Sequence, residues 1–372
     1  MRVLVLGGYG FFGSRIVTLL SRESGLDVLV AGRRQSEAAA LVERLAPTAA
    51  SLTPLVLDVS APDFPQRLRE LSPQVVIHTC GPFQGQDYRV AEACLEAGCD
   101  YIDLADGRDF VTGITALDER ARASGVRIIS GASSVPGLSG AVVDALAPAF
   151  SRLDGIDIAI SPGNKTDRGL ATVRAILSYG GEAIPGWRDG QSIRVTGWGS
   201  MQRHRFGSPV GHRWVSDCDV PDISLLPARY PTLRQVRFRA GLELGFLHLG
   251  MVLMACLRRL RLLPNLSRLA VPLKRISEWF LPFGSDRGAM SVEMRGLDHQ
   301  GEPCRRYWEL SALNGDGPYV PTLCSVALVR RRQHGKPLEP GAYAAPGGLG
   351  LADILPVSEG LAIRTTLQGE AP

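Results

Sequence analysis

The sequence predicts an α/β protein, with an N-terminal doubly wound parallel sheet of the Rossmann type and a second α+β domain containing a mixed or antiparallel sheet. The chain opens with an apolar strand at residues 3–6, followed by Gly8, Gly10 and Gly13 in the G-x-G-x-x-G order. Strand and helix patterns then alternate as far as residue 130, after which strands follow one another more directly. These two observations place a dinucleotide-binding fold before a domain of different construction.

The 372 residues of the chain are enough to bury two cores. We expect residues 1–150 to form the nucleotide-binding domain and residues 151–348 to form a substrate and dimerisation domain. The segment 349–372 has a helix-then-strand pattern and is expected to return to the first domain.

Each glycine of the loop is expected to have a separate structural role. Gly8 is expected to make the tight turn, Gly10 lets the backbone touch a pyrophosphate, and Gly13 lets the next helix lie close to the strand. That helix begins near Phe11 and Phe12, whose free N–H groups would bind the pyrophosphate. The alternative is a strand-turn-helix unit that binds no ligand.

The second predicted strand, residues 27–31, ends where an NAD-selective site carries an acid for the ribose hydroxyl. Arg33 and Arg34 follow Gly32 there instead, and guanidinium groups match the geometry of a phosphate. This favours NADP(H) over NAD(H), unless both arginines are only solvated charges. Asp58, after a third strand, is suited either to hydrogen-bond the adenine or to cap the next helix.

The alternation continues with strands at 75–79, 101–104 and 126–130 and helices at 88–97 and 114–124. Ligands of such sheets bind beyond the carboxyl ends of the strands. The groups expected to face the nicotinamide are therefore Gly81, Pro82, Phe83, Asp103 and the loop 131–136.

Four motifs together resemble the saccharopine dehydrogenase-like oxidoreductases: Gly-Gly-Tyr-Gly-Phe-Phe-Gly at 7–13, Cys-Gly-Pro-Phe at 80–83, the run 90–103, and Gly-Asp-Gly-Pro at 315–318. The resemblance implies an NADP-binding Rossmann domain joined to a mixed α+β domain. The superfamily includes saccharopine reductases, carboxynorspermidine dehydrogenases and enoyl reductases that act on lipid-linked substrates. The implied nucleotide contacts are Gly8, Gly10, Gly13, Arg33, Arg34, Asp58 and the turn at Gly81.

The segment 131–137, Gly-Ala-Ser-Ser-Val-Pro-Gly, departs from the Asp-Pro-Gly pattern of saccharopine reductases. An amino-acid adduct is therefore not the expected substrate, and the resemblance transfers no catalytic residue.

The second half is predicted to contain six strands and four helices. The strands are expected at 156–161, 192–197, 213–215, 236–239, 291–295 and 305–310, and the helices at 170–179, 242–260, 266–279 and 321–331.

Three residues are candidates for proton transfer. Lys165 lies in a polar loop, 162–169, between a strand and a helix, and burial near a cofactor can lower the pKa of a lysine. Asp103 and Tyr88 come from the crevice of the first domain. The competing interpretations are a solvated Lys165, an Asp103 that caps a loop and a Tyr88 that belongs to the core. The leading hypothesis is an NADP-dependent reductase that delivers hydride to an imine, carbonyl or activated alkene. The alternative is a non-catalytic NADP(H) sensor or scaffold.

The net charge and the cysteine content indicate which partners and which cellular compartment to expect. A net charge of +4 with scattered positive residues does not favour nucleic acid. Seven cysteines lack C-x-x-C spacing, and His204 and His212 are eight apart, so we expect neither a metal site nor a disulfide framework. Reduced thiols and an N-terminus that begins directly in a strand favour the cytoplasm and no signal peptide. We expect a small-molecule substrate and a homodimer formed through residues 150–330.

The stretch 240–283 is a pair of apolar helices with arginines between them. Glu243 and His248 interrupt the first helix, which argues against a membrane span of about 20 residues. One interpretation is a buried pair that closes a core or a dimer interface. The other is a hairpin that lines an apolar substrate tunnel, as a lid over a cleft facing Lys165, or that rests on a membrane surface.

Overall fold

A computed structural model describes residues 1–368 of the chain. The chain forms two compact units, the first made of Met1–Leu138 with Tyr319–Glu359 and the second of Ser139–Pro318 with the residues from Gly360 onward. The first boundary therefore falls about a dozen residues before the expected position, and the chain re-enters the first unit at Tyr319 rather than near residue 349.

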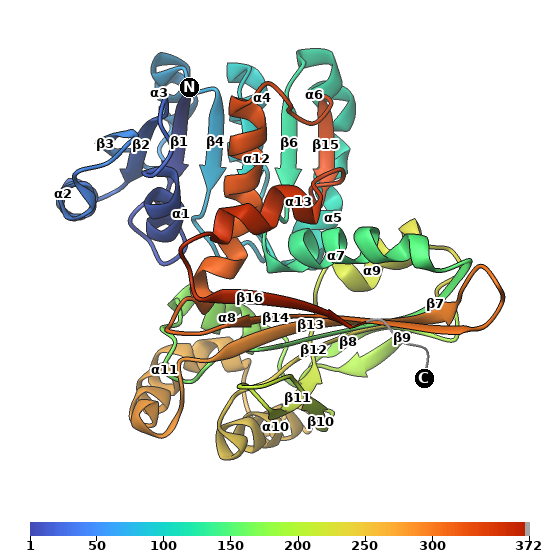
Figure 1. The fold of residues 1–372 in the computed structure, drawn as a ribbon. Helices are drawn as coiled ribbons and strands as arrows, with labels where there is room; N and C mark the ends of the chain where they lie inside the picture. Colours follow the sequence, from blue (N-terminus) through green and yellow to red (C-terminus); the bar gives the residue numbers. More distant parts are fainter. Residues whose placement is uncertain (369–372) are drawn as a thin grey trace. The chain divides into compact units, whose positions relative to one another are not determined.

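The first unit is built on a seven-stranded sheet with the strand order β15-β6-β5-β4-β1-β2-β3 (Figure 1). Every neighbouring pair is parallel, as shown by Val3 of β1, which lies opposite Val28 on one side and Val75 on the other. The expected parallel Rossmann-type sheet is confirmed. Its strands are β1 (Arg2–Leu6), β2 (Asp27–Gly32), β3 (Ser51–Val56), β4 (Val75–His78), β5 (Asp100–Asp103), β6 (Arg127–Ser130) and β15 (Gly341–Ala344).

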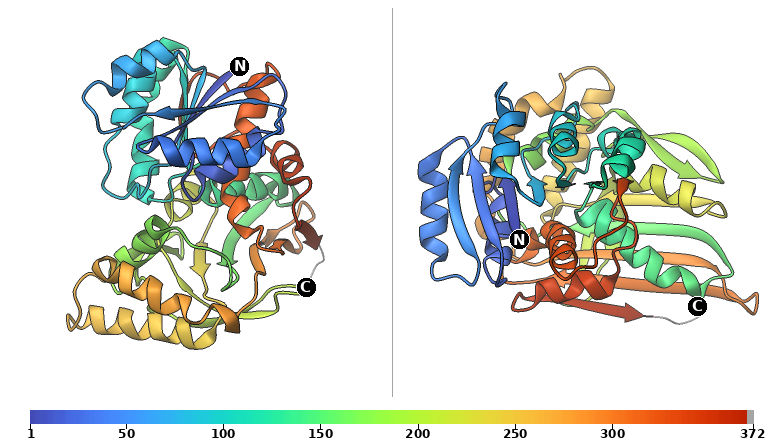
Figure 2. Two further views of the ribbon diagram at one scale, coloured as in Figure 1. Left: turned by 90° about the vertical axis from the view of Figure 1, so that its left-hand side faces the viewer. Right: turned by 90° about the horizontal axis from the view of Figure 1, so that it is seen from above.

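Helices cover both faces of this sheet, as Figure 2 shows in its two views. Helix α12 packs on α1, while α4 packs on α3 and α6. The helices of this unit are α1 (Gly13–Leu20), α2 (Gln35–Leu45), α3 (Phe64–Leu71), α4 (Arg89–Ala97), α5 (Arg108–Gly113), α6 (Asp118–Ser124), α12 (Leu323–Gln333) and α13 (Leu351–Ile354). Two of them, α4 and α6, end at glycines in the left-handed region, Gly98 and Gly125, as their sequences predict.

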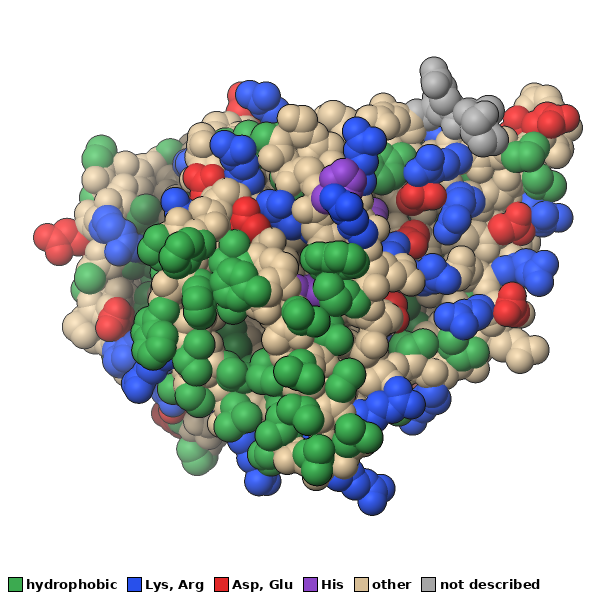
Figure 3. All heavy atoms as spheres, turned by 90° about the horizontal axis from the view of Figure 1, so that it is seen from below, with side chains coloured by type: hydrophobic (Ala, Val, Ile, Leu, Met, Phe, Trp, Pro, Cys, Tyr) green, Lys and Arg blue, Asp and Glu red, His purple; other side chains and the backbone are tan. Residues whose placement is uncertain are grey.

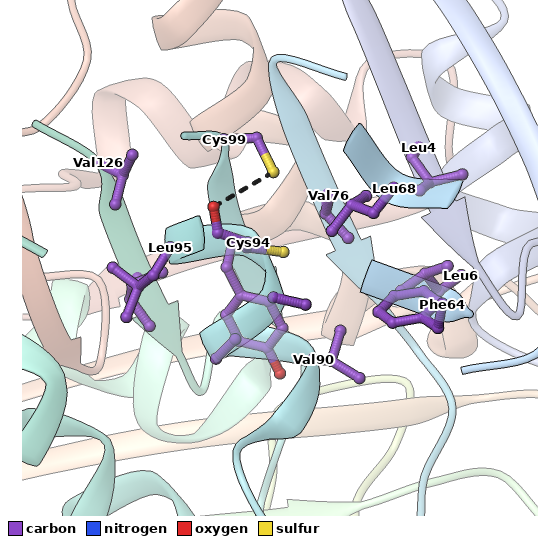
Figure 4. Packing of buried hydrophobic residues seen from close by; sticks show 14 of the residues in the cluster. Leu4, Leu6, Phe64, Leu68, Val76, Val90, Cys94, Leu95, Cys99 and Val126 are labelled. Carbon is purple, nitrogen blue, oxygen red and sulfur yellow. Dashed lines mark hydrogen bonds between the residues drawn. The ribbon is translucent and has the colours of Figure 1, made fainter. Parts of the chain in front are cut away.

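The core beside α3 and α4 is apolar and closely packed (Figure 4). Leu4 and Leu6 of β1 face Phe64 of α3, and Cys94 of α4 lies among them without exposure to solvent. The thiol of Cys99 donates a weak hydrogen bond to the Cys94 carbonyl. These cysteines therefore serve as small apolar core residues, and all seven cysteines of the chain are free thiols.

Strand β15, which follows helix α12, is the seventh strand of the first sheet, and the pattern in the first 130 residues could not predict it. The apolar residues of α12 from Leu323 to Val329 are buried, and its Arg332 pairs with the buried Asp100 at 3.0 Å. Arg330 pairs with Glu23. These contacts explain why the return begins at Tyr319.

The second unit contains a nine-stranded mixed sheet. Its main path is β10-β11-β12-β7-β13-β14-β16, and β8 pairs with both β12 and β9. β12 and β7 run parallel, whereas the pairs β7 and β13, β13 and β14, and β14 and β16 run antiparallel. The expected mixed sheet is confirmed. The strands are β7 (Arg152–Ser161), β8 (Ala183–Arg188), β9 (Gln191–Thr196), β10 (Gln202–Arg205), β11 (His212–Asp217), β12 (Gln235–Ala240), β13 (Gly288–Leu297), β14 (Pro303–Ala312) and β16 (Ile363–Gln368).

All six strands expected in the second half are present, with β8, β10 and β16 in addition. Strand β16 pairs with β14, so the end of the chain joins the second sheet and not, as expected, the first. The short α13 belongs to the first unit, but the strand that follows it pairs with the edge of β14 in the second unit. The helices are α7 (Ser139–Leu146), α8 (Leu170–Ser178), α9 (Asp222–Arg229), α10 (Gly245–Arg259) and α11 (Ala270–Glu278). Within the described residues, none of the helices is both long and apolar enough to cross a bilayer.

Candidate nucleotide site and the loop that carries Lys165

The glycine loop between β1 and α1 is shaped almost entirely by its backbone. Gly7 has a φ of +75°, and its carbonyl accepts a hydrogen bond of 2.8 Å from the N–H of Gly10. This hydrogen bond closes a tight turn over residues 7–10 in which Gly8 is a central residue, as expected, and Gly7 is its left-handed residue. Gly8 also donates to the Ala31 carbonyl at 2.9 Å, and a Cβ at Gly8 would lie 2.9 Å from Val30. It lets β2 approach the loop.

Gly10 and Gly13 are positions where a side chain would collide with the loop itself. A Cβ at Gly13 would lie only 2.1 Å from the Gly7 carbonyl oxygen, and one at Gly10 would lie 2.9 Å from it. Among residues 1–368, the N–H groups of Phe11 and Phe12 have no hydrogen-bond partner. Two free donors beside the first turn of α1 form the environment that a pyrophosphate requires.

Tyr9 connects the glycine loop to the end of β2. Its hydroxyl accepts a hydrogen bond of 2.9 Å from the backbone N–H of Arg34, whose guanidinium lies 5.6 Å from the Tyr9 ring centre. A Cβ at Gly32 would come within 2.3 Å of the same ring. Gly32 therefore has to lack a side chain so that Tyr9 can lie flat against β2. No local sequence feature predicted this role of Tyr9.

Arg33 and Arg34 are both exposed at the carboxyl end of β2, as a phosphate-binding pair must be. The pKa of Asp58 is lowered, first by hydrogen bonds from Ser60 and to a smaller extent by the charge of Arg33. Asp58 Oδ1 accepts from both the N–H and the hydroxyl of Ser60. It does not cap the next helix, because the residue preceding α3 is Asp63. The adenine contact of Asp58 stays a prediction.

The end of β4 lies against the glycine loop. The hydroxyl of Thr79 donates to the Leu6 carbonyl at 2.8 Å, and a Cβ at Gly7 would lie 2.7 Å from the same hydroxyl oxygen. The following turn at Gly81 and Pro82 is held by the Gln86 amide, which donates to the carbonyls of Cys80 and Pro82. The structure thus brings Gly81 and Pro82 to the same edge of the sheet as the glycine loop.

Asp103 has no exposed surface. Its Oδ1 accepts hydrogen bonds from the N–H groups of Ala105 and Gly131, at 2.9 and 2.8 Å, and from the Ser130 hydroxyl. Burial raises the pKa of Asp103 to about 6, against the opposing effect of these hydrogen bonds. A carboxyl in this position fastens the loops after β5 and β6 and is out of reach of a substrate, which corresponds to the capping interpretation.

Tyr88 has its hydroxyl committed to the Phe110 carbonyl at 2.8 Å, and its ring packs against Phe110. It is half-buried and acts as a packing residue. Lys165 belongs to the second unit and is exposed. The three catalytic candidates therefore occupy three different environments, and only the side chain of Lys165 is both exposed and outside any hydrogen bond within residues 1–368.

The loop 162–169 is held by residues distant in the sequence, with Glu243 at the centre. Glu243 Oε2 accepts from the N–H of Asn164 at 2.6 Å and from the N–H of Ser285 at 2.8 Å. Its Oε1 accepts from the Ser285 hydroxyl and from Arg213, at 2.6 and 3.0 Å. Burial acts to raise the pKa of Glu243, but the hydrogen bonds and Arg213 outweigh it and lower the pKa.

The same loop bonds directly to the chain that follows α11. The N–H of Lys165 donates to the Ser285 carbonyl at 2.9 Å, and the Asn164 amide donates to the Phe280 carbonyl at 2.8 Å. The helical hairpin and the Lys165 loop are thus adjacent within the second unit. A lid over a cleft stays a prediction. In the sequence Glu243 only interrupts an apolar run, and no local feature predicted that it would accept hydrogen bonds from three distant residues.

The family model described as the saccharopine dehydrogenase NADP binding domain matches residues 3–129. Residues 3–129 belong to that family. The glycine loop, with positions that a Cβ would fill and two free N–H donors, fits the pyrophosphate of NADP, and NADP is the cofactor of this domain.

Among similar proteins, one from Mycobacterium tuberculosis, named as an enoyl reductase of the trans-acting type, is 31% identical over 138 residues. The match covers 36% of this chain and 33% of that protein. A protein of Arabidopsis thaliana, named as a mitochondrial saccharopine dehydrogenase-like oxidoreductase, is 29% identical over 156 residues, covering 38% of this chain and 34% of its own. The matched segments span about one third of the length of these relatives.

A solved structure of saccharopine dehydrogenase from Saccharomyces cerevisiae has the same fold. It superposes with a TM-score of 0.70 and covers 100% of both chains at 15% sequence identity. The whole chain is therefore saccharopine dehydrogenase-like in fold.

Proposed function

We propose that this chain is an NADPH-dependent reductase that delivers hydride to an activated alkene, imine or carbonyl of a small, hydrophobic substrate. The observation that carries the proposal is the arrangement at the carboxyl edge of the first sheet. There the glycine loop presents the free N–H groups of Phe11 and Phe12, and its Tyr9 hydroxyl accepts a hydrogen bond from Arg34, next to Arg33. When bound there, NADPH supplies the hydride. The N–H groups would hold its pyrophosphate, and the two guanidinium groups its ribose phosphate.

The activated alkene is the substrate class that we favour. Relatives matched over the N-terminal domain are named as enoyl reductases, including a trans-acting enoyl reductase of Mycobacterium ulcerans. The segment 131–137 also departs from the pattern of saccharopine reductases, which argues against an amino-acid adduct. Lys165 is the proposed proton donor, because its side chain is exposed while its backbone is fixed by Ser285. We also propose that the protein works as a cytoplasmic homodimer.

The experiment that tests the reductase is the loss of NADPH fluorescence on addition of a panel of α,β-unsaturated thioesters, ketones, imines and aldehydes. Turnover with an unsaturated compound supports the proposal. Tight NADPH binding with no turnover of any member of the panel would contradict it and favour the non-catalytic sensor. The specific observation behind that second candidate is that Asp103 is inaccessible and Tyr88 is committed to Phe110.

The first prediction concerns the cofactor. A hydrogen bond to a charged group contributes roughly 1.5 to 3 kcal/mol, so each lost phosphate contact should weaken NADPH binding by about 10- to 150-fold. Fluorescence titration should show tighter binding of NADPH than of NADH. The double substitution Arg33→Ala and Arg34→Ala should remove that preference and leave NADH affinity almost unchanged.

The matched control is Arg120→Ala, which removes an exposed arginine of α6 paired with Glu92. This variant should bind NADPH as the unaltered protein does. Equal affinity of the unaltered protein for the two cofactors would contradict the assignment of Arg33 and Arg34.

A further inference from the structure

Exposed apolar side chains are concentrated on one part of the second unit. Among residues 1–368, thirteen large hydrophobic residues are exposed, and ten of them belong to the segment 246–283. Trp279 and Phe283 are 74% and 72% exposed. Figure 3 shows hydrophobic side chains gathered over one face of the molecule. We define the apolar face as Phe246, Leu249, Leu253, Leu260, Leu262, Val271, Ile276, Trp279, Leu281 and Phe283.

Helix α10 has two apolar sides. His248, Met251 and Ala255 are buried on one side of the helix, and Phe246, Leu249 and Leu253 are exposed on the other. Both sets follow the spacing of one helical stripe. An ordinary surface helix carries polar residues on its outer side, so the exposed stripe of α10 needs a partner. Only one side of α10 packs on the core of the chain, so the pair is not buried within that core, and its burial in a dimer interface stays a prediction.

Positive charge accompanies the apolar face. The segment 245–283 contains six basic residues and a single acidic one, Glu278. Glu278 pairs with Lys274, and Arg258 pairs with Glu182. In the described part of the chain, Arg261, Arg268 and Arg275 have no acidic partner within salt-bridge distance. The apolar face thus carries uncompensated guanidinium groups, which favour an anionic surface.

We propose that the apolar face of α10 and α11 docks on the surface of an anionic lipid bilayer. The helices have 15 and 9 residues, too short to span a hydrocarbon core, and are suited to lie in the plane of the interface. Trp279 supplies an aromatic ring of the kind that prefers the headgroup level, and Phe283 adds apolar surface. Arg261, Arg268 and Arg275 meet the negative lipid headgroups. The inference holds whether or not the chain is a reductase.

A second copy of the chain is the less suitable occupant. A twofold dimer through this face would place the same patch against itself, so the arginines of one copy would approach those of the other. A bilayer brings the opposite charge and accepts the exposed leucines without a complementary protein surface. The excess of positive charge in the segment 245–283 therefore favours an anionic bilayer over a second copy of the chain.

The test is flotation of the full chain with phosphatidylcholine vesicles that either contain or lack phosphatidylglycerol. We expect binding to the anionic vesicles that is at least about ten-fold tighter than to the neutral ones, and that weakens as salt is added. The double substitution Leu253→Glu and Trp279→Glu should reduce binding at least about ten-fold. Circular dichroism should show an unchanged fold, since both side chains are exposed.

The control is Leu367→Glu on β16, which makes one such substitution at an exposed leucine outside the apolar face and should bind as before. Arg261→Glu with Arg275→Glu should abolish the preference for anionic vesicles. Failure of the unaltered chain to float with either vesicle would overturn the proposal, as would equal binding to both. A dimer in light scattering that the Leu253→Glu and Trp279→Glu variant dissociates, without vesicle binding, would assign the face to a second copy instead.

Discussion

The glycine loop of the first unit and the loop 162–169 of the second unit both connect a buried strand to a helix, but different forces hold them. The glycine loop is fixed by its own backbone, through the turn at Gly7 and the close approach of Gly13. The loop 162–169 is fixed by Glu243 and Ser285, which are distant in the sequence. A loop held by backbone contacts depends on which side chains are absent, whereas a loop held by a carboxylate depends on one side chain and its charge.

The largest effect is expected from removing the carboxylate of the second loop. Glu243→Ala leaves Arg213, whose side chain is only 12% exposed, without its acidic partner. Breaking such a pair from one side costs about 3–5 kcal/mol. Urea denaturation should show a loss of that size. Glu278→Ala, which removes an exposed glutamate of α11 paired with Lys274, should change the free energy of unfolding by less than about 0.5 kcal/mol.

If the loss for Glu243→Ala is no larger than for Glu278→Ala, the loop 162–169 is held by its local backbone, and the contrast between the two loops fails.

Acid should weaken the second unit through His248 of α10, five residues after Glu243. Its Nε2 lies 2.9 Å from the Ser216 hydroxyl and its Nδ1 accepts from the Leu242 N–H. Burial lowers the pKa of His248 to about 4 from 6.5. Below pH 6.5 the unfolded chain takes up a proton that the folded chain does not, so stability is lost as the pH falls from 6.5 towards 4, by up to about 3 kcal/mol.

The measurement is the free energy of unfolding of the unaltered chain minus that of His248→Gln, followed as the pH is lowered. The difference isolates His248, because Asp103 and Asp222, with pKa values raised to about 6, have the opposite effect and are present in both proteins. It should shrink as the pH falls through this range. His212→Gln, at an exposed position of β11, serves as the control for the substitution itself.

The smallest effect on stability is expected from the glycine loop, where the substitution adds a methyl group instead of removing a side chain. Gly13→Ala places a Cβ 2.1 Å from the Gly7 carbonyl, which the backbone must relieve. Such overpacking costs about 1–3 kcal/mol, and the moved loop should bind NADPH more weakly. Gly140→Ala inside α7, where nothing lies within 4 Å of an added Cβ, should stabilise by up to about 1 kcal/mol. Thermal unfolding and NADPH titration compare the two variants; unchanged NADPH affinity for Gly13→Ala would separate the loop from the cofactor.

The sequence by itself determined the first unit up to β6, because periodicity and glycine spacing are local properties. Strand ends, the stops of α4 and α6 at Gly98 and Gly125, and the pair Arg33 and Arg34 could all be predicted from neighbouring residues. Which glycine of the turn has the positive φ could not be predicted, since adjacent glycines are equally able to adopt it; the structure has it at Gly7.

The tertiary structure alone decided which distant residues meet. Tyr9 acquires its role from β2, Glu243 from Ser285 and Arg213, and Asp103 from the loop after β6. The strand at 363–368 has no local sequence feature that predicts pairing with β14 rather than with the first sheet. Burial and charge pairing depend on what lies opposite a residue in space, and an amino-acid sequence specifies that only through the complete fold.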